Sequence, residues 1–149
     1  MNKKIAIIGG GNLGIAIAEG LLKSGFNKPA EITVTRRQID RLNFLAEKGV
    51  SVTNDNNNAV KQSEVVVLCV KPFQVSDILR EIATELSDDK IFISVVTGVS
   101  MQEMQSMLPD KKCLFRAMPN TAIAIQQSIT CVCALNNNDE ELTYVNDLF

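Results

Sequence analysis

The feature that most constrains this fold is a glycine-rich junction between two apolar runs near the start of the chain. Residues 3–22 read KKIAIIGGGNLGIAIAEGLL. The run Ile5–Ile8 holds β-branched residues and alanine, the pattern of a strand that is buried on both faces of a parallel sheet. Over residues 12–23 the apolar positions recur at helical spacing. The glycines between the two runs therefore predict a tight turn from a strand into a helix.

The same stretch could instead be a secretion signal, with Lys3 and Lys4 as its basic region and small residues before Glu19 as its cleavage site. The glycines and Asn12 interrupt the hydrophobic segment, however, where a signal needs a continuous helix former. No apolar stretch reaches the roughly 18 residues of a membrane span. We therefore expect a cytoplasmic protein without a membrane partner.

Beyond the junction, strand-like apolar runs alternate with amphipathic, helix-like segments. The expected strands are 31–35, 50–53, 64–70, 91–96, 114–118 and 128–135. The expected helices are 38–48, 59–62, 75–86, a helix that begins after Ser100 and one that begins at Asp139. Such alternation predicts an α/β, Rossmann-type fold, a doubly wound and mostly parallel sheet with helices on both faces. We expect this domain to span residues 1–138.

The glycines Gly9, Gly11 and Gly14 have the spacing G-x-G-x-x-G, and their place between a strand and a helix makes the motif specific. The first glycine permits the tight turn, the second lets the backbone approach a pyrophosphate, and the third lets the helix pack closely on the sheet. The helix N-terminus then directs free N–H groups at the phosphates. The motif predicts a dinucleotide site, and a glycine-rich turn without a ligand is the alternative.

The end of the second expected strand indicates which dinucleotide binds. Sites for NAD commonly carry an Asp or Glu there that bonds the ribose 2′-hydroxyl, whereas this chain has Thr35, Arg36 and Arg37. A hydroxyl and two guanidinium groups suit a 2′-phosphate. We therefore expect NADP, used as NADPH, with solvated surface arginines as the alternative.

The composition excludes several other kinds of chemistry. The 149 residues include no histidine, which removes the commonest general base, every Ser-His or Cys-His nucleophile and most zinc sites. A formal net charge of −2 offers no basic field for nucleic acid. We interpret the cysteines Cys69, Cys113, Cys131 and Cys133 as small core residues, and we expect no metal site.

Taken together, the motifs resemble the N-terminal half of the pyrroline-5-carboxylate reductase family. The segments that carry the resemblance are, in chain order, GGGNLGIAIAEGLL, TRR, VVVLCVKPFQ, SVVTGVS and FRAMPNTAIAIQQS. The family reduces the cyclic imine Δ1-pyrroline-5-carboxylate to L-proline with NAD(P)H, the last step of proline synthesis. The resemblance runs from Lys4 to about Leu135 and implies that this chain is the cofactor-binding domain of such an enzyme.

The resemblance also implies roles for individual residues. The pyrophosphate would lie against the glycine turn, the 2′-phosphate against residues 35–37, the adenosine ribose against Asn56, and the nicotinamide against residues that follow the later strands. The residues implied at the cofactor are Gly9, Gly11, Asn12, Leu13, Gly14, Thr35, Arg36, Arg37, Asn56, Val70, Lys71, Pro72, Thr97, Gly98, Met118, Pro119 and Asn120. The candidate catalytic residues are Asn120, Lys71 and Thr121.

The match with the family pattern has two departures. Family members have a glycine soon after the M-P-N-T block, where this chain has Gln127 and Ser128. Family members also continue into a helical dimerisation domain, so we expect residues 139–149 to begin a helix that leads into such a domain. The resemblance thus implies a homo-oligomer for the full-length protein.

Two other functions stay open at this point. A β-hydroxyacid or 6-phosphogluconate-type dehydrogenase shares the opening fold, but it needs a catalytic lysine from a following domain and a different motif where this chain reads TGVS. A non-catalytic NADP-binding module is the other alternative. An imine reductase suits a chain without histidine, because a protonated imine already attracts hydride and positioning supplies most of the acceleration.

Overall fold

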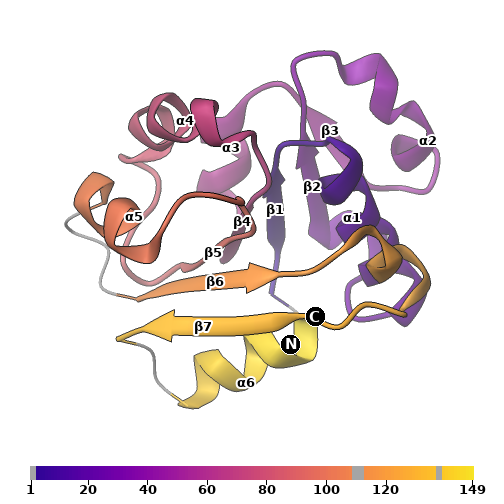
Figure 1. Ribbon diagram of the computed structural model, residues 1–149. Helices are drawn as coiled ribbons and strands as arrows, with labels where there is room; N and C mark the ends of the chain where they lie inside the picture. The colour runs from indigo at the N-terminus through magenta and orange to yellow at the C-terminus, as the bar shows by residue number, and fades with distance from the viewer. Residues whose placement is uncertain (1–2, 109–112, 137–138) are drawn as a thin grey trace.

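The computed structural model describes residues 3–108, 113–136 and 139–149, which fold around one sheet with strand order β3-β2-β1-β4-β5-β6-β7 (Figure 1). The strands are β1 (Ile5–Ile8), β2 (Ile32–Thr35), β3 (Ser51–Thr53), β4 (Val65–Leu68), β5 (Ile91–Ser94), β6 (Leu114–Met118) and β7 (Cys131–Leu135). Every neighbouring pair is parallel except β6 and β7, which are antiparallel. The expected doubly wound, mostly parallel sheet is confirmed.

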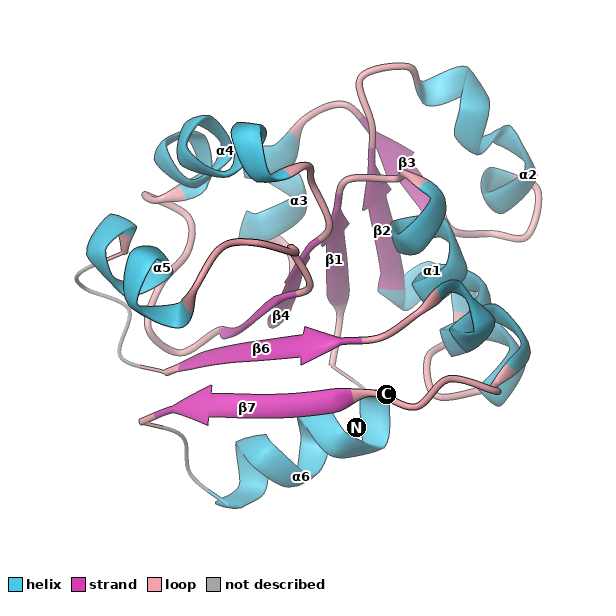
Figure 2. Cartoon of the chain, in the orientation of Figure 1, coloured by secondary structure: helices cyan, strands magenta, loops and turns pink. Residues whose placement is uncertain are grey.

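The helices cover both faces of this sheet (Figure 2). They are α1 (Asn12–Ser24), α2 (Asn43–Ala46), α3 (Asn56–Lys61), α4 (Val75–Ile82), α5 (Met101–Met107) and α6 (Asp139–Leu148). Short 3₁₀ helices span Pro29–Glu31, Ile39–Leu42, Pro72–Gln74 and Thr121–Ile125. None of the helices in the described ranges has the length and apolar character needed to cross a membrane.

The helix expected over 38–48 is not continuous, and this expectation is wrong. A 3₁₀ turn, Ile39–Leu42, leads into the single turn of α2. The reason lies in the spacing, because Ile39, Leu42 and Leu45 recur every third residue, which is the 3₁₀ period. Leu42 and Leu45 are fully buried, so the three-residue repeat places both against the sheet.

Alternate residues of each central strand belong to two hydrophobic cores, one on each face of the sheet. In β1, Ile5 and Ile7 belong to the core under α1, α2 and α6, whereas Ala6 and Ile8 belong to the core under α3, α4 and α5. All residues of β1, β4 and β5 are buried. Burial on both faces explains their continuous apolar sequence. It also makes the carboxyl edge of these strands a rigid platform for the loops that follow.

Residues 139–149 pack on this same domain. Val145 and Leu148 of α6 are buried in the core under α1, and the ring of Tyr144 meets that of Phe26 edge-on at 5.5 Å. The helix expected to begin at Asp139 is present as α6, and it contributes to this hydrophobic core. The boundary expected at residue 138 lies outside the described residues.

The interpretation of all four cysteines as core residues is wrong for two of them. Cys113 is buried and Cys69 is half-buried, but Cys131 and Cys133 are exposed. Both exposed cysteines lie on β7, the outermost strand of the sheet (Figure 1). Their neighbours on that strand point the other way and pack against the core under α1 and α6, so the cysteines face the opposite side.

Candidate functional site

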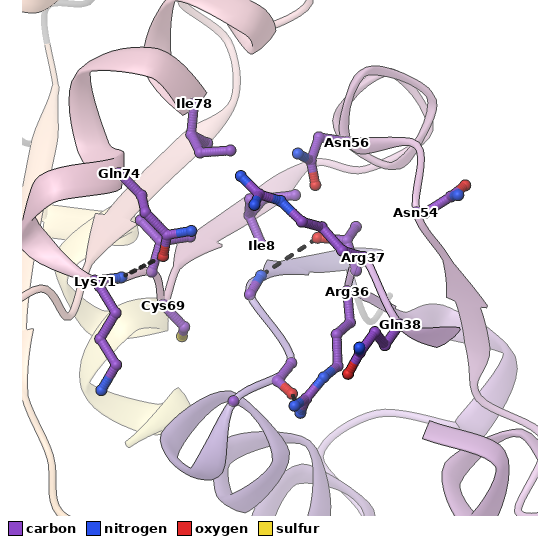
Figure 3. Close-up of a pocket in the computed structure, with 15 residues that line it drawn as sticks. Ile8, Arg36, Arg37, Gln38, Asn54, Asn56, Cys69, Lys71, Gln74 and Ile78 are labelled. Carbon is purple, nitrogen blue, oxygen red and sulfur yellow. Dashed lines mark hydrogen bonds between the residues drawn. The ribbon is translucent and has the colours of Figure 1, made fainter. Parts of the chain in front are cut away.

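A pocket of about 430 Å³ opens at the carboxyl edge of the sheet, where β1 and β4 lie side by side (Figure 3). Strand order reverses between β1 and β4, so the loops after these strands diverge and leave a crevice. Ligands of open α/β sheets bind in such a crevice. The lining residues are Ile8, Gly9, Gly10, Gly11, Thr35, Arg36, Arg37, Gln38, Asn54, Asn56, Cys69, Val70, Lys71, Gln74 and Ile78.

The three motif glycines have different physical reasons to be glycine. Gly9 has φ +110°, and a Cβ on it would lie 2.6 Å from the Cys69 carbonyl oxygen. A Cβ on Gly14 would collide with the carbonyl oxygen of Gly9. A Cβ on Gly11, by contrast, would meet nothing within 4 Å. Gly9 and Gly14 are thus required by the fold, whereas Gly11 is left bare toward the pocket.

The N-terminus of α1 meets the pocket at Gly11. This residue is the N-cap in an extended conformation, it makes no side-chain cap, and the first turn of α1 has no acidic residue. The first N–H groups of a helix have no partner within the helix, and the helix dipole places partial positive charge there. The bare Gly11 backbone and this helix end therefore form a cradle that fits a pyrophosphate.

Thr35 stabilises the glycine turn from β2. Its hydroxyl accepts a hydrogen bond from the Gly9 N–H at 3.3 Å, and its carbonyl accepts one from the Gly10 N–H at 2.6 Å. The residue is buried, with 2% of its surface exposed. Thr35 lines the pocket as expected, but its hydroxyl already holds the turn that would receive the phosphates.

The two arginines after β2 point in different directions. The Arg36 N–H donates to the Thr53 carbonyl at 3.0 Å, and its guanidinium donates to the Gly10 carbonyl oxygen. Arg37 is exposed, and Figure 3 shows its guanidinium extending across the pocket toward Asn56 and Ile78. Neither guanidinium pairs with a carboxylate of the described residues. Arg37 is therefore the cation that an anionic group in this pocket would meet first.

Asn56, the first residue of α3, lies across the pocket from the glycine turn. Its amide nitrogen donates to both carboxylate oxygens of Glu81 on α4, each at 3.2 Å. The amide oxygen is left to accept hydrogen bonds from a ligand. This arrangement fits a ribose hydroxyl donor, the group that the resemblance implies at this position.

The chain turns sharply after β4, where Pro72 begins a 3₁₀ helix. The Lys71 N–H donates to the Gln74 side-chain oxygen at 3.1 Å, which fixes this turn. The Lys71 side chain is exposed at the rim of the pocket, so its ammonium group is available to a ligand (Figure 3). Pro72 shapes the turn and does not line the pocket.

Cys69 lies on the pocket wall beside Gly9. Burial raises the pKa of its thiol well above the usual range. A raised pKa favours the neutral thiol over the thiolate, which is the nucleophilic form. Its carbonyl, which faces Gly9, explains why that position admits no side chain.

The residues expected at the nicotinamide lie at the same sheet edge but outside this pocket. Thr97 and Gly98 follow β5 and are exposed, and Met118 ends β6. The Asn120 side chain accepts from the Ala122 N–H at 2.9 Å, so it caps the 3₁₀ helix that begins at Thr121. Pro119 and Thr121 likewise do not line the pocket, nor do Asn12 and Leu13 in the first turn of α1.

Sequence reasoning missed several lining residues, namely Ile8, Gln38, Asn54, Cys69, Gln74 and Ile78. Ile78 could not have been found, because its apolar position on α4 also suits a core residue. In the described part of the chain, no three His, Cys, Asp or Glu side chains converge as ligands for a metal.

Residues 4–98 match the family described as NADP oxidoreductase, coenzyme F420-dependent. The chain is 37% identical over 143 residues to pyrroline-5-carboxylate reductase 1 of Dictyostelium discoideum, covering 96% of this chain and 26% of the relative. It is 41% identical over 134 residues to pyrroline-5-carboxylate reductase 2 of the same organism, covering 88% and 45%.

Solved structures show the same relation. A pyrroline-5-carboxylate reductase from Coxiella burnetii superposes with a TM-score of 0.92 at 31% identity, covering 99% of this chain and 56% of that one. The enzyme of Plasmodium falciparum, solved with NADP bound, gives a TM-score of 0.90 at 23% identity, covering 99% and 54%, and supports the fold. This chain thus spans between about a quarter and about half the length of these relatives.

Proposed function

Since this chain belongs to the NADP oxidoreductase family, as the amino-terminal NADP-binding domain of the pyrroline-5-carboxylate reductases, we propose that it serves the reduction of Δ1-pyrroline-5-carboxylate to L-proline with NADPH. The observation that carries the proposal is that the bare Gly11 backbone at the N-terminus of α1 and the exposed Arg37 line one pocket. A helix N-terminus that binds a pyrophosphate and a cation that binds a 2′-phosphate, in one crevice, suit a phosphorylated dinucleotide.

Different residues of the pocket bind different parts of the cofactor. The α1 N-terminus, with Gly9 and Gly11, binds the pyrophosphate, and Arg37 binds the 2′-phosphate. The Arg36 guanidinium donates to the Gly10 carbonyl, and its positive charge also attracts the same phosphate. Asn56 accepts a hydrogen bond from the adenosine ribose through the amide oxygen that Glu81 leaves free.

The nicotinamide end extends along the carboxyl edges of β4, β5 and β6. We place it against Val70, Lys71 and the backbone that follows the later strands, over Thr97, Gly98, Met118, Pro119, Asn120 and Thr121. When bound, NADPH supplies the hydride that reduces the imine carbon. The residues of this edge orient the ring and exclude water, and the candidates for touching the substrate are Lys71, Asn120 and Thr121.

The proposed enzyme extends beyond this chain. We infer a carboxyl-terminal helical domain that completes the imine pocket and assembles the protein into a homo-oligomer, and we place the enzyme in the cytoplasm. The support is the length of the relatives together with the open substrate side of this edge, where Thr97 and Asn120 are exposed.

The test measures cofactor binding and turnover separately. Calorimetric titration of the 149-residue chain should give tighter binding for NADPH than for NADH. Consumption of NADPH with Δ1-pyrroline-5-carboxylate should be slow with this chain and fast with the longer protein, with proline as the product. Binding without turnover by either protein would instead support a non-catalytic NADP-binding module. Turnover of a β-hydroxyacid in place of the imine would support the dehydrogenase alternative.

A further inference from the structure

The side of β7 that faces α5 carries two exposed cysteines, and the sulfur of one of them contacts a methionine of α5. Cys131 and Cys133 are two residues apart on this strand, so the strand pleat directs both side chains to one face. The residues between and beyond them, Val132 and Ala134, pack on the opposite face against the core under α1. Both cysteines are exposed and carry free thiols.

The third sulfur comes from the first residue of α5. The Cys133 thiol donates to the Met101 thioether, with the two sulfur atoms 3.4 Å apart. Two residues that are 32 apart in the sequence, one on α5 and one on β7, therefore bring their sulfur atoms together. Met118 lies opposite Cys131 across the β6–β7 pair. Met118 belongs to the edge where we place the nicotinamide, so it is not among the proposed metal ligands.

We propose that Cys131, Cys133 and Met101 form a binding site for monovalent copper. Thiolate and thioether sulfurs are the soft ligands that select Cu(I). Zinc, by contrast, usually completes four ligands with further thiolates, imidazoles or carboxylates. The chain has no histidine, and no third Cys, Asp or Glu among the described residues joins the two cysteines. The donor set is thus two thiolates and one thioether.

The spacing suits one metal ion. Adjacent residues of a strand advance by about 3.3 Å, so the Cα atoms of Cys131 and Cys133 lie about 6.6 Å apart. Metal–thiolate bonds of about 2.3 Å place two sulfurs on one ion no more than about 4.6 Å apart. Exposed cysteine side chains that lean toward each other can close this difference without moving the backbone. Met101 is already in contact with one of them.

The surrounding charge suits a monovalent ion with two thiolates. Two thiols release two protons when they bind the metal, and the resulting complex with Cu(I) has a net charge of −1. Arg116 lies directly opposite Cys133 in the β6–β7 register, on the same face of the sheet. Its buried Nε has no hydrogen-bond partner among the described residues. The guanidinium can therefore balance the charge of the complex.

The test is an anaerobic titration of the 149-residue chain with Cu(I), in competition with the chromophoric chelator bicinchoninate. We expect one Cu(I) per chain. Cys131→Ser and Cys133→Ser should each weaken binding by more than the roughly 10–100-fold that loss of an outer-shell partner costs. Met101→Leu removes the thioether ligand and should weaken binding by at least about tenfold.

Two matched variants serve as controls. Met107→Leu changes an exposed methionine of the same helix, and Cys113→Ala removes a buried thiol. Both should bind Cu(I) as the parent chain does, and circular dichroism should show that all variants are folded. The proposal is overturned if the Cys131→Ser, Cys133→Ser double variant retains the site. It is also overturned if Met101→Leu binds like Met107→Leu, or if Zn(II) displaces Cu(I) at equal concentration. The Cys131, Cys133, Met101 and Met107 variants should bind NADPH as the parent chain does, so this outcome is independent of the proposed function.

Discussion

Replacing Gly11 by alanine should separate ligand binding from folding in this domain. A Cβ at this position meets nothing within 4 Å, and the backbone angles of φ −83° and ψ −168° are open to alanine. Alanine lowers the entropy of the unfolded chain, which stabilises the fold by roughly 0.4–1 kcal/mol. Its weaker N-cap preference costs about 0.5 kcal/mol or more. The two effects oppose each other, so the free energy of unfolding should stay within about 0.5 kcal/mol of the parent value.

The same methyl group would occupy the space that the pyrophosphate needs. Losing one charge-assisted hydrogen bond from the helix N-terminus costs about 1.5–3 kcal/mol. At 1.4 kcal/mol per factor of ten, this weakens NADPH binding by about 10- to 150-fold. NADH carries the same pyrophosphate, so its affinity should fall by a similar factor.

Gly14→Ala is the matched control, because it adds the same methyl group three residues later. There the methyl would strike the Gly9 carbonyl, which is backbone and cannot move aside without disturbing a turn at φ +110°. Overpacking of this kind costs about 1–3 kcal/mol, occasionally more. Urea denaturation gives the stability of both variants, and calorimetry gives their affinity for NADPH. Parent-like NADPH binding by folded Gly11→Ala would refute the placement of the pyrophosphate.

Three further outcomes are expected. Arg37→Ala should weaken NADPH binding by about tenfold or more while leaving NADH nearly unchanged, since a charge-assisted phosphate contact is worth about 1.5–3 kcal/mol. Arg36→Ala should weaken the binding of both cofactors, because its guanidinium also holds the Gly10 carbonyl. Equal losses of NADPH and NADH affinity in Arg37→Ala would contradict the assignment of Arg37 to the 2′-phosphate. Hydrogen bonds from the Ser100 N–H and hydroxyl lower the pKa of Glu103. Because the folded pKa lies below the unfolded one, this stabilisation is present above the ordinary Glu pKa and is lost as pH falls through the folded value. Glu103→Gln should therefore flatten the fall in stability on acidification, measured by urea denaturation at neutral pH and at pH about 3. Finally, a thiol reagent should modify Cys131 and Cys133 rapidly in the folded chain, whereas the buried Cys113 should react only after unfolding. Rapid loss of all four thiols in mass spectra would argue against the described burial.

The expected elements correspond to those of the structure wherever a local pattern was strong. The strand Ile5–Ile8, the start of α1 at Asn12 and the capping of α5 by Ser100 and Glu103 are all confirmed. The continuous helix over 38–48 is not, because its apolar residues have a three-residue repeat that the sequence reading treated as a helical one.

By itself, the sequence determined the sheet-and-helix order, the glycine turn and the basic end of β2. Strand and helix periodicities and the glycine spacing are local properties, and they are legible without knowledge of the contacts. Only the tertiary structure decided that Arg36 is held by Gly10 while Arg37 extends into the pocket. It alone placed Cys131 and Cys133 on an exposed face, next to the Met101 sulfur of a distant helix. In a sequence, the two adjacent arginines cannot be told apart, and the two alternating cysteines do not show whether they are buried or exposed. Their roles depend on which groups from distant parts of the chain pack beside them, and local patterns carry no record of that packing.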